Sequence, residues 1–511
     1  MNIPSRNQII LYGSIVILII VGLSILWTPI LWLFIIVGPA TLLALYDMIQ
    51  RKHTILRNFP FIGHFRFWLE SLGPEMHQYF VENNTDGTPF NKNQRSFVYK
   101  RSKKSLETHP FGTELDVYKD AYEWAPHSIY AKEVMDEHPR VRIGGPDCKQ
   151  PYDAALLNIS AMSYGSLSAN AVRALNKGAN IGGFFHDTGE GGISPYHLEG
   201  GGDLVWEIGS GYFGCRTRDG NFSEELFKKQ ATNPVVKMVE IKLSQGAKPG
   251  HGGVLPAVKN TPEIANIRGV EPYTKVVSPA YHKAFSDAEG LLHFVKKLRD
   301  LSGGKPSGFK LCVGSKKEFI EICEKMIETG IKPDFITVDG SEGGTGAAPI
   351  EFSDSIGMPL EEGLTFVVDT LEGYDLKKDI KVIASGKIIT AFDIIKTLSL
   401  GADLCNSARG MMFALGCIQA LKCDSNECPT GVTTHKSSLT QGLVVSDKSV
   451  RVANFQGETI NAALELIAGM GIDDLSQLNR SLIYKRTTPD NMASFDIMYP
   501  PVKSGAYLSK K

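Results

Sequence analysis

The stretch FITVDGSEGGTG, residues 335–346, decides the fold, because an apolar run passes directly into a glycine-rich loop. The next apolar run, KVIA (381–384), ends in Ser385-Gly386-Lys387, and the one after it ends in Asn406-Ser407-Ala408-Arg409-Gly410. Runs of this kind are typical of parallel strands buried on both faces. Glycine lets the backbone approach a ligand closely, so three successive strand ends of this composition indicate a ligand-binding edge.

From about residue 153 the chain alternates short β-branched runs with helical segments. The expected strands include 155–159, 276–277, 308–313, 335–338, 380–384 and 402–405, and the expected helices include 288–301, 317–328 and 391–400. Such alternation predicts an α/β fold with a parallel sheet. The number of units favours a (β/α)8, or TIM, barrel over an open doubly wound sheet. In a barrel, functional residues lie at the carboxyl ends of the strands.

The three late loops predict a site for an anionic group. Barrel phosphate sites commonly use the loops after the last strands and the start of a short helix. Glycine N–H groups and the side chains of Lys387 and Arg409 suit such a group. The residues expected there are Gly343, Gly344, Thr345, Gly346, Ser385, Gly386, Lys387, Ala408, Arg409 and Gly410. The alternative is that these residues serve only tight turns.

Charged residues in earlier loops predict a second binding region. Glu190 stands between glycines in DTGEGG (187–192), an unusual place for a carboxylate. Lys248 lies in KLSQGAKPGHGG (242–253), and Arg268 follows it by twenty residues. Two cations in one site would suit a dicarboxylate. The alternative is a lysine and an arginine that are merely solvated.

Three of the eight cysteines crowd into one segment with the spacing C-x5-C-x4-C-P, formed by Cys417, Cys423, Cys428 and Pro429. Soft thiolates select iron–sulfur clusters, and this spacing fits a cluster with three protein ligands. Zinc with His435 as fourth ligand is a second interpretation, and buried, inert cysteines are a third. A disulfide framework is not expected in a cytoplasmic chain of this size.

The N-terminal segment carries no charged residue from Ile9 to Leu45. One straight helix of that length would extend roughly 55 Å, nearly twice the ~30 Å hydrocarbon thickness of a bilayer. The break at Trp27-Thr28-Pro29 therefore predicts a transmembrane helical hairpin over residues 1–50. Basic residues flank both ends, so the positive-inside rule places both flanks, and everything after them, in the cytoplasm. A cleaved signal peptide and a buried soluble hairpin are the alternatives.

Net charge and local composition indicate which partners to exclude and where the domains begin and end. Lys and Arg number 54 and Asp and Glu number 55, a net charge of −1, so we expect no nucleic-acid partner. Residues 51–150 are polar and mixed, which predicts an irregular lead-in that packs on the barrel. We expect the barrel domain over 151–480 and a C-terminal tail over 481–511. A homo-oligomer is compatible with this plan.

Residues 150–470 resemble the flavin-binding synthase domain of glutamate synthase large subunits. The matching motifs are SAMSYGSLS (160–168), DTGEGG (187–192), KLSQGAKPGHGGVLP (242–256), SPAYH (278–282), DGSEGGTGAAP (339–349) and GCIQALKCDSNECPTGVTTH (416–435). The resemblance implies a barrel of the FMN-binding type and a [3Fe-4S] cluster on Cys417, Cys423 and Cys428, in the loop 417–428. It also implies reductive conversion of 2-oxoglutarate, through an imine formed with ammonia, to L-glutamate.

The resemblance further implies which residues bind the flavin. Lys310 would place its ammonium near the N1 edge of the ring and stabilise the anionic reduced form. Met162, Ser163 and Tyr164 would lie against the ring, so that hydride passes from N5 to the imine carbon. The ten late-loop residues would then hold the rest of the cofactor.

The substrate residues follow from the same resemblance. Lys248 and Arg268 would bind the two carboxylates of 2-oxoglutarate, with Ser163 beside them. Glu190, Gln245 and Lys248 are the residues expected to act in catalysis, through proton transfer or contact with ammonia. This assignment places the substrate on the side of the flavin formed by the earlier loops.

The chain departs from the family pattern at three places. His251 stands where a glutamate is usual, Lys283 follows a single His282 where two histidines and an aspartate are usual, and Ser385-Gly386-Lys387 replaces an acidic turn. We expect neither a glutaminase nor an NADPH-binding GxGxxG element in this chain. Electrons would come from a ferredoxin or an NAD(P)H-dependent reductase, and ammonia from solution or from a separate glutaminase.

These departures leave two alternatives to a membrane-tethered glutamate synthase. One keeps the flavin and acts on another glutamate-like or amino-acid substrate. The other is a non-catalytic membrane redox relay, which would reduce its flavin without forming a product from 2-oxoglutarate. A barrel of the inosine-monophosphate dehydrogenase type would need a nucleophilic cysteine in an active-site loop, and the three-cysteine spacing argues against it.

Overall fold

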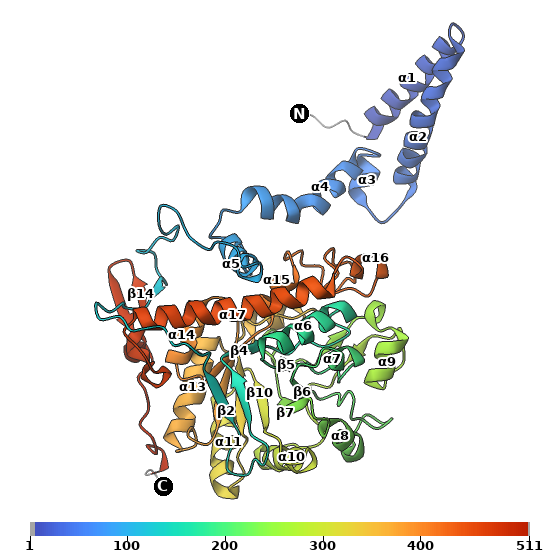
Figure 1. Ribbon diagram of the computed structural model, residues 1–511. Coiled ribbons are helices and arrows are strands. Elements are labelled where there is room, and N and C mark those ends of the chain that lie inside the picture. The colour runs from blue at the N-terminus through green and yellow to red at the C-terminus, as the bar shows by residue number, and fades with distance from the viewer. Residues whose placement is uncertain (1–5, 509–511) are drawn as a thin grey trace. The chain divides into compact units, whose positions relative to one another are not determined.

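Eight parallel strands close into a barrel in the computed structural model, which describes residues 6–508 (Figure 1). In chain order the strands are β4 (Leu157–Ile159), β5 (His186–Asp187), β6 (Leu204–Ile208), β7 (Val236–Lys242), β10 (Ser307–Leu311), β11 (Phe335–Asp339), β12 (Lys381–Ser385) and β13 (Leu404–Ser407). β13 pairs with β4, with Cys405 opposite Leu157, and this pairing closes the ring. The predicted (β/α)8 fold is confirmed.

Helices surround the strands and bury their apolar faces against them. The longer ones are α6 (Ala169–Gly182), α8 (Glu224–Ala231), α10 (Ala288–Leu301), α11 (Lys316–Thr329), α13 (Leu360–Gly373), α14 (Ala391–Ser399) and α17 (Val445–Gly469). The shorter ones are α7 (Pro195–Leu198), α9 (Pro262–Arg268), α12 (Ile350–Ser355), α15 (Arg409–Leu415) and α16 (Ser437–Thr440). Asp287 caps α10 by accepting from the Gly290 N–H at 2.7 Å. The predicted helices 288–301, 317–328 and 391–400 match α10, α11 and α14 within one residue.

The prediction of a barrel strand at 276–277 is wrong. Val276–Val277 forms β9, which pairs antiparallel with β8 (Val254–Leu255) as a separate two-stranded sheet. The barrel instead uses β5, β6 and β7. Their sequences carry charged residues such as Glu207 and Glu240 at fully buried positions, which interrupt the apolar pattern that identifies a buried strand.

The chain divides into two compact units, one up to Gly87 and one from Thr88 onward. The first contains α1 (Arg6–Ser24), η1 (Thr28–Leu33), α2 (Phe34–Ile49), α3 (Thr54–Asn58), α4 (Gly63–Met76) and η2 (His77–Val81). Asp47 of α2 is buried and accepts from the Phe61 N–H at 2.9 Å, while His64 Nε2 lies 2.9 Å from its carboxylate. Residues 54–81, expected as part of the lead-in, thus belong to the same compact unit as the apolar helices.

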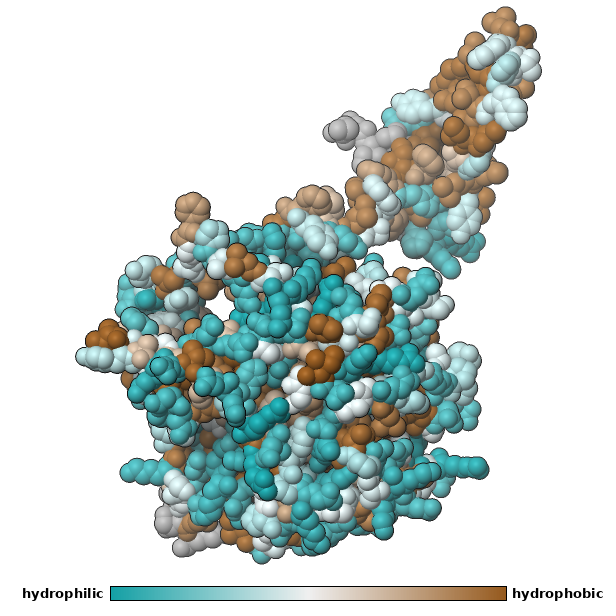
Figure 2. All heavy atoms as spheres, viewed as in Figure 1, coloured by the Kyte–Doolittle hydropathy of each residue, from teal (hydrophilic) through white to brown (hydrophobic). Residues whose placement is uncertain are grey.

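The two N-terminal helices, Arg6–Ser24 and Thr28–Ile49, are long and apolar enough to cross a membrane. Apolar side chains make up most of the face of these helices that Figure 2 shows. Leu18, Ile25 and Leu26 are among the exposed ones. The helical run breaks just before Pro29, which stands in the first turn of η1 where its missing N–H costs nothing.

The segments on either side of the barrel strands meet each other. α5 (Lys92–Ser102) packs on α15 and α17, and β2 (Arg140–Ile143) pairs with β3 (Tyr152–Ala155). β1 (Glu123–Trp124) joins β14 (Tyr484–Thr488) and β15 (Asn491–Ser494) in a three-stranded sheet, followed by α18 (Phe495–Met498). The described part of the C-terminal segment is therefore a structured element of the barrel unit.

Candidate functional site

The loops after β11, β12 and β13 line one cavity at the carboxyl end of the barrel. All ten late-loop residues predicted from the sequence are among its lining residues, from Gly343 to Gly410. At Gly344, an added Cβ would lie 2.7 Å from Cδ of Arg409, so a larger residue would displace that side chain. The three neighbouring strands of the barrel bring these loops together, as the sequence predicts.

Two cations of these loops face the ring of Phe90. The guanidinium carbon of Arg409, the first residue of α15, lies 4.7 Å from the ring centroid, and Lys387 Nζ lies 5.9 Å from it. Arg409 Nη2 also donates to the Glu342 carbonyl at 2.6 Å. Burial lowers the pKa of Arg409 to about 10, and burial and the charge of Arg409 lower the pKa of Lys387. Two like charges held this close favour an anionic ligand.

Phe90 is a lining residue that the sequence did not reveal. It is fully buried, and its backbone N–H donates to Gln419 Oε1 at 3.2 Å. The Gln419 amide donates in return to the carbonyls of Thr88 and Phe90, at 3.2 and 3.1 Å. Because Phe90 lies in a polar stretch far along the chain from Gln419, no local pattern distinguished it.

The loop after β4 contributes Met162 and Ser163 to the cavity, as predicted. Tyr164, the next residue, is not among the lining residues, and its assignment to the cofactor stays a prediction. Its hydroxyl donates to Glu263 Oε2 at 2.7 Å, and its ring packs on Tyr196 and His435. The side chain of Tyr164 thus stabilises the loop after β4 through contacts with Glu263, Tyr196 and His435.

Lys310 lines the inner end of the cavity and forms a buried ion pair. Its Nζ lies 3.1 Å from Glu207 Oε2, and both side chains are at most 5% exposed. Burial alone would lower the pKa of Lys310, but the Glu207 carboxylate and its neighbours raise that pKa well above the ordinary value. Lys310 therefore keeps its positive charge inside the barrel.

A cluster of carboxyl groups lies beside this lysine. One oxygen of each of Asp187, Glu207 and Glu240 lies within 4.8 Å of the others. Burial raises the pKa of Asp187 well above its ordinary value and that of Glu240 to about 7. The Thr337 hydroxyl donates to Glu240 Oε1. The cluster therefore retains protons near neutral pH, and the ammonium of Lys310 balances its remaining charge.

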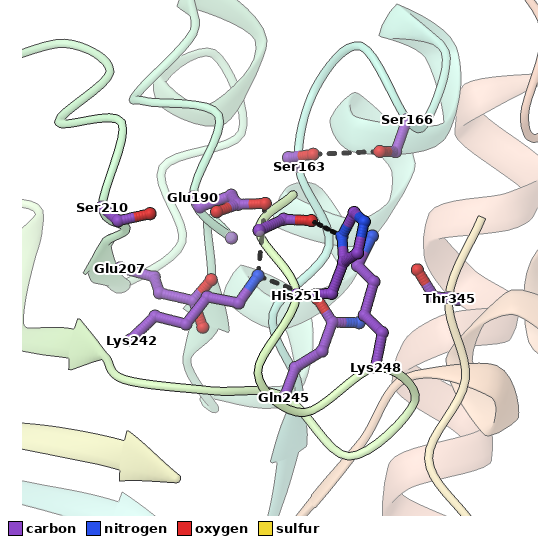
Figure 3. Close-up of polar contacts among 12 residues, drawn as sticks. Ser163, Ser166, Glu190, Glu207, Ser210, Lys242, Gln245, Lys248, His251 and Thr345 are labelled. Atoms are coloured by element: carbon purple, nitrogen blue, oxygen red, sulfur yellow. Dashed lines mark hydrogen bonds and ion pairs between the residues drawn. The ribbon is translucent and has the colours of Figure 1, made fainter. Parts of the chain in front are cut away.

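Glu190, Lys242 and Gln245 form a connected group in the second binding region (Figure 3). Lys242 Nζ lies 3.2 Å from Glu190 Oε1 and donates to Gln245 Oε1 at 2.8 Å. Burial would raise the pKa of Glu190, but the charges of Lys242, Lys248 and Arg268 lower it. Lys242 was missed in the sequence, although it begins the motif that contains Lys248.

Lys248 and Arg268 line the same cavity and are nearly fully buried. Lys248 Nζ donates to the Ala347 carbonyl at 2.7 Å, and Arg268 Nη2 donates to the Tyr164 carbonyl at 3.0 Å. Burial lowers the pKa of Lys248 to about 8 and that of Arg268 to about 10. Arg268 Nε has no hydrogen-bond partner, so this side chain retains a donor for a ligand.

Two of the three departures from the family pattern are not among the lining residues, although His251 adjoins Lys248 and its N–H donates to the Lys248 carbonyl at 3.2 Å. His251 is not a lining residue; its ring packs edge-on against Phe352, 5.1 Å between centroids. Lys283 is exposed and its Nζ lies 3.5 Å from the Asp219 carbonyl. Only Ser385-Gly386-Lys387 lines the cavity, on the side of the late loops.

The cysteine loop, residues 417–428, forms another wall of the cavity. Cys417, Cys423 and Cys428 all line it. Burial raises the pKa of Cys417 to about 12 and also raises that of Cys423. At Cys428 burial is outweighed by hydrogen bonds from Thr430 and Thr433, which lower the pKa of the thiol. The three thiols are thus gathered at one end of the site.

The arrangement gives no support to zinc with His435. Among residues 6–508, the carboxyl cluster is the group of potential ligands whose atoms lie within 4.8 Å of one another, and the three cysteines do not meet that limit. Tetrahedral Zn–S bonds of ~2.3 Å would place the sulfurs about 3.8 Å apart. Moreover, His435 Nε2 lies 2.8 Å from the Gly165 carbonyl.

Fold and site together define a (β/α)8 barrel protein whose carboxyl-end cavity combines an anion-binding edge with a three-cysteine loop. Residues 141–473 match the family model described as the conserved region in glutamate synthase. The chain therefore belongs to the glutamate synthase family and is an oxidoreductase of that family.

Curated relatives agree with this assignment. The chain is 38% identical to the glutamate synthase large subunit-like protein YerD of Bacillus subtilis (strain 168), covering 88% of this chain and 93% of YerD. It is 32% identical to the archaeal glutamate synthase (NADPH) of Methanocaldococcus jannaschii, covering 70% of this chain and 66% of that protein. It spans only 20% of the glutamate synthase (NADPH) large chain of Azospirillum brasilense, with 31% identity.

Similar solved structures include mandelate oxidase with (S)-2-phenylpropionate, at 14% identity and a TM-score of 0.44. The similarity covers 78% of this chain and 98% of that one. The barrel assignment rests on the strand pairing itself.

Proposed function

We propose that this protein uses bound FMN to aminate 2-oxoglutarate reductively to L-glutamate, with electrons relayed through an iron–sulfur cluster. One observation carries the proposal: the late loops, Lys248 with Arg268, and all three cysteines line the same cavity. Reductive amination needs a hydride donor, a site for a dicarboxylate and an entry for electrons. The cavity offers residues for each of them side by side.

The residues fit a flavin mononucleotide. The late loops combine close backbone approach at Gly344 and Gly386 with the charges of Lys387 and Arg409, which suits a phosphate. Lys310 keeps a buried positive charge that stabilises an anionic reduced ring. Met162 supplies an apolar surface. When bound, FMN supplies hydride transfer to an imine carbon.

The cysteine loop fits a [3Fe-4S] cluster. Three thiols that share a cavity wall match a three-cysteine ligand set. Bound there, the cluster supplies one-electron transfer. The chain's contribution is to keep the thiols out of bulk water, since Cys428 is buried and Cys417 and Cys423 are only partly exposed.

Lys248 and Arg268 bind the two substrate carboxylates. Each now donates to a backbone carbonyl, of Ala347 and Tyr164 respectively, and a carboxylate is a stronger acceptor than a carbonyl. Ser163 Oγ lies 3.4 Å from Arg268 Nη2 and completes this end of the substrate site. The two side chains thereby fix the orientation of the carbon that is reduced.

Glu190 and Lys248 take part in ammonia binding and proton transfer. The cations around Glu190 keep it a carboxylate at neutral pH, so it accepts hydrogen bonds from ammonia or ammonium. Lys248, with a pKa of about 8, is able to donate a proton near neutral pH. Gln245 holds Lys242 in place beside Glu190.

The proposal extends to location and partners. The two apolar helices anchor the protein in a membrane as a hairpin, with the catalytic unit in the cytoplasm, where basic flanks favour it. A separate ferredoxin or NAD(P)H-dependent reductase delivers electrons, and ammonia arrives from solution or from a separate glutaminase. We assign 2-oxoglutarate as the substrate because two buried cations in one cavity, Lys248 and Arg268, suit its two carboxylates.

The test uses detergent-purified, anaerobically handled full-length protein. We expect a flavin absorbance spectrum together with iron and acid-labile sulfide. Addition of 2-oxoglutarate and ammonium to the chemically reduced protein should reoxidise the flavin and form glutamate in equal amount. Flavin and cluster without glutamate would reject the synthase reaction in favour of the redox relay.

A further inference from the structure

Lys259 is a buried cation that no step above uses. It is the last residue of the short helix η3 (Ala257–Lys259), is 2% exposed and lines the cavity. Its Nζ donates to the Ser166 carbonyl at 2.6 Å and to the Cys423 carbonyl at 3.2 Å. One ammonium therefore bridges the loop after β4 and the cysteine loop.

Neighbouring contacts fix the same junction. Asn426 Nδ2 lies 3.5 Å from the Val258 carbonyl, and the N–H of His435 donates to Asn426 Oδ1 at 2.8 Å. His435 Nε2 in turn lies 2.8 Å from the Gly165 carbonyl. The lysine is thus held by a network on both sides, and its ammonium cannot swing out to solvent without breaking both of its own hydrogen bonds.

No ion pair joins Lys259 to a carboxylate among residues 6–508, and the acidic side chain that acts on it electrostatically, Asp424, is solvent-exposed. Among the described residues its printed polar contacts are both carbonyl oxygens, and it takes part in none of the ion pairs. A buried unpaired charge is costly unless an anion compensates it. Its electrostatic neighbours include the sulfurs of Cys423 and Cys428. An anionic group bound by those sulfurs would supply the missing counter-charge.

We propose that Lys259 is a positioning residue that raises the reduction potential of the cysteine-bound cluster and ties that cluster to the loop carrying Met162 and Ser163. The inference rests on the proposed function. One-electron reduction adds one negative charge to the cluster, no bond forms or breaks in the protein, and the ammonium keeps its proton. A fixed positive charge nearby favours the more negative, reduced state.

The test is an EPR-monitored redox titration of full-length protein with dithionite and mediator dyes. Lys259→Met should shift the midpoint potential of the cluster to a lower value, and Lys259→Arg should stay close to the unmutated protein. Lys422→Met is the matched control. It removes an equal charge next to Cys423 from an exposed position, where water and salt screen it, so a much smaller shift is expected.

An unchanged potential in Lys259→Met would overturn the inference and leave the proposed function intact. If Lys259→Met loses its iron, Lys259→Gln is titrated in its place, because Gln removes the charge but keeps a donor. A shift in Lys259→Gln equal to that in Lys422→Met would also overturn it. Unmutated protein that contains flavin but no iron would reject the cluster itself, which is a different failure.

Discussion

The two ends of the cavity differ in whether a buried carboxylate faces their cations. At the substrate end, the single carboxylate of Glu190 pairs with Lys242 and lies near the charges of Lys248 and Arg268, so it offsets part of the positive charge there. At the cysteine end, two buried cations, Lys259 and Arg95, take part in no ion pair among the described residues. Arg95 Nη1 donates only to the Phe90 carbonyl, at 2.6 Å, and acts electrostatically on Cys417.

This difference teaches what each end is built to hold. An end whose cations are partly offset by a buried carboxylate is less costly when empty, which suits a substrate that binds and dissociates in each turnover. Buried cations that no carboxylate contacts are costly without a bound anion, which suits a resident anionic group. The comparison therefore predicts a permanent occupant at the cysteines and an exchangeable one near Glu190.

The largest effect is expected from removing the iron–sulfur cluster that we propose on the three cysteines. Cys423→Ser should lose most of the iron and acid-labile sulfide and nearly all turnover with a one-electron donor, because a serine hydroxyl is a poor ligand for these soft sites. Iron and sulfide analysis of anaerobically purified protein measures it. Cys148→Ser is the matched control, since Cys148 is a partly exposed cysteine outside the cavity. Full metal content in Cys423→Ser would refute the ligand set.

At the substrate end, Arg268→Ala should weaken 2-oxoglutarate binding and leave the cluster in place. A charge-assisted hydrogen-bond pair contributes about 2–3 kcal/mol, which corresponds to roughly 30- to 150-fold in affinity. Perturbation of the flavin spectrum by added 2-oxoglutarate gives the dissociation constant.

Arg216→Ala provides the control for this substitution. Arg216 also stacks on Phe213, with 5.6 Å from its guanidinium carbon to the ring centroid against 5.1 Å for Arg268. It does not line the cavity, so its loss should leave the dissociation constant nearly unchanged. Equal affinity in Arg268→Ala and in the unmutated protein would remove Arg268 from the substrate site.

The contrast between the ends also explains what the sequence was able to predict. Late-loop residues such as Gly344 and Arg409 belong to contiguous motifs at strand ends, so the parallel topology alone brings them together. Helix limits were equally predictable, because capping residues and apolar periodicity are local. The three cysteines were found for the same reason, since their spacing is local.

Residues that depend on long-range contacts were not predictable. Phe90 enters the cavity from a segment with no pattern of its own and is fixed by Gln419 more than three hundred residues later. Tyr164 adjoins two lining residues, yet its side chain turns to Glu263. The strands that contain Glu207 and Glu240 were not predicted for a related reason. Burial of these carboxyl groups is stabilised by Lys310, which belongs to another strand.

A smaller effect is expected from pH at the substrate end. The pKa of Lys248 is lowered to about 8, so its ammonium is present below that pH and is lost above it. Affinity for 2-oxoglutarate should therefore fall about tenfold for each pH unit above 8. Equilibrium binding measured from about pH 6 to about pH 10 avoids the titration of ammonia. Lys248→Arg should abolish the decline, because a guanidinium stays charged; an unchanged decline would assign it to another group.

The smallest effect is expected at the positions where the chain departs from its family. Lys283 is exposed and His251 packs on Phe352, and neither lines the cavity. Lys283→Asp and His251→Glu, which introduce acidic residues at these positions, should each change the 2-oxoglutarate dissociation constant by less than about threefold. At Lys283 water and salt screen the introduced charge, and at His251 the side chain is directed against the ring of Phe352. A change as large as that of Arg268→Ala would mean that the substrate end extends beyond the cavity and that its ligand is a larger molecule than 2-oxoglutarate.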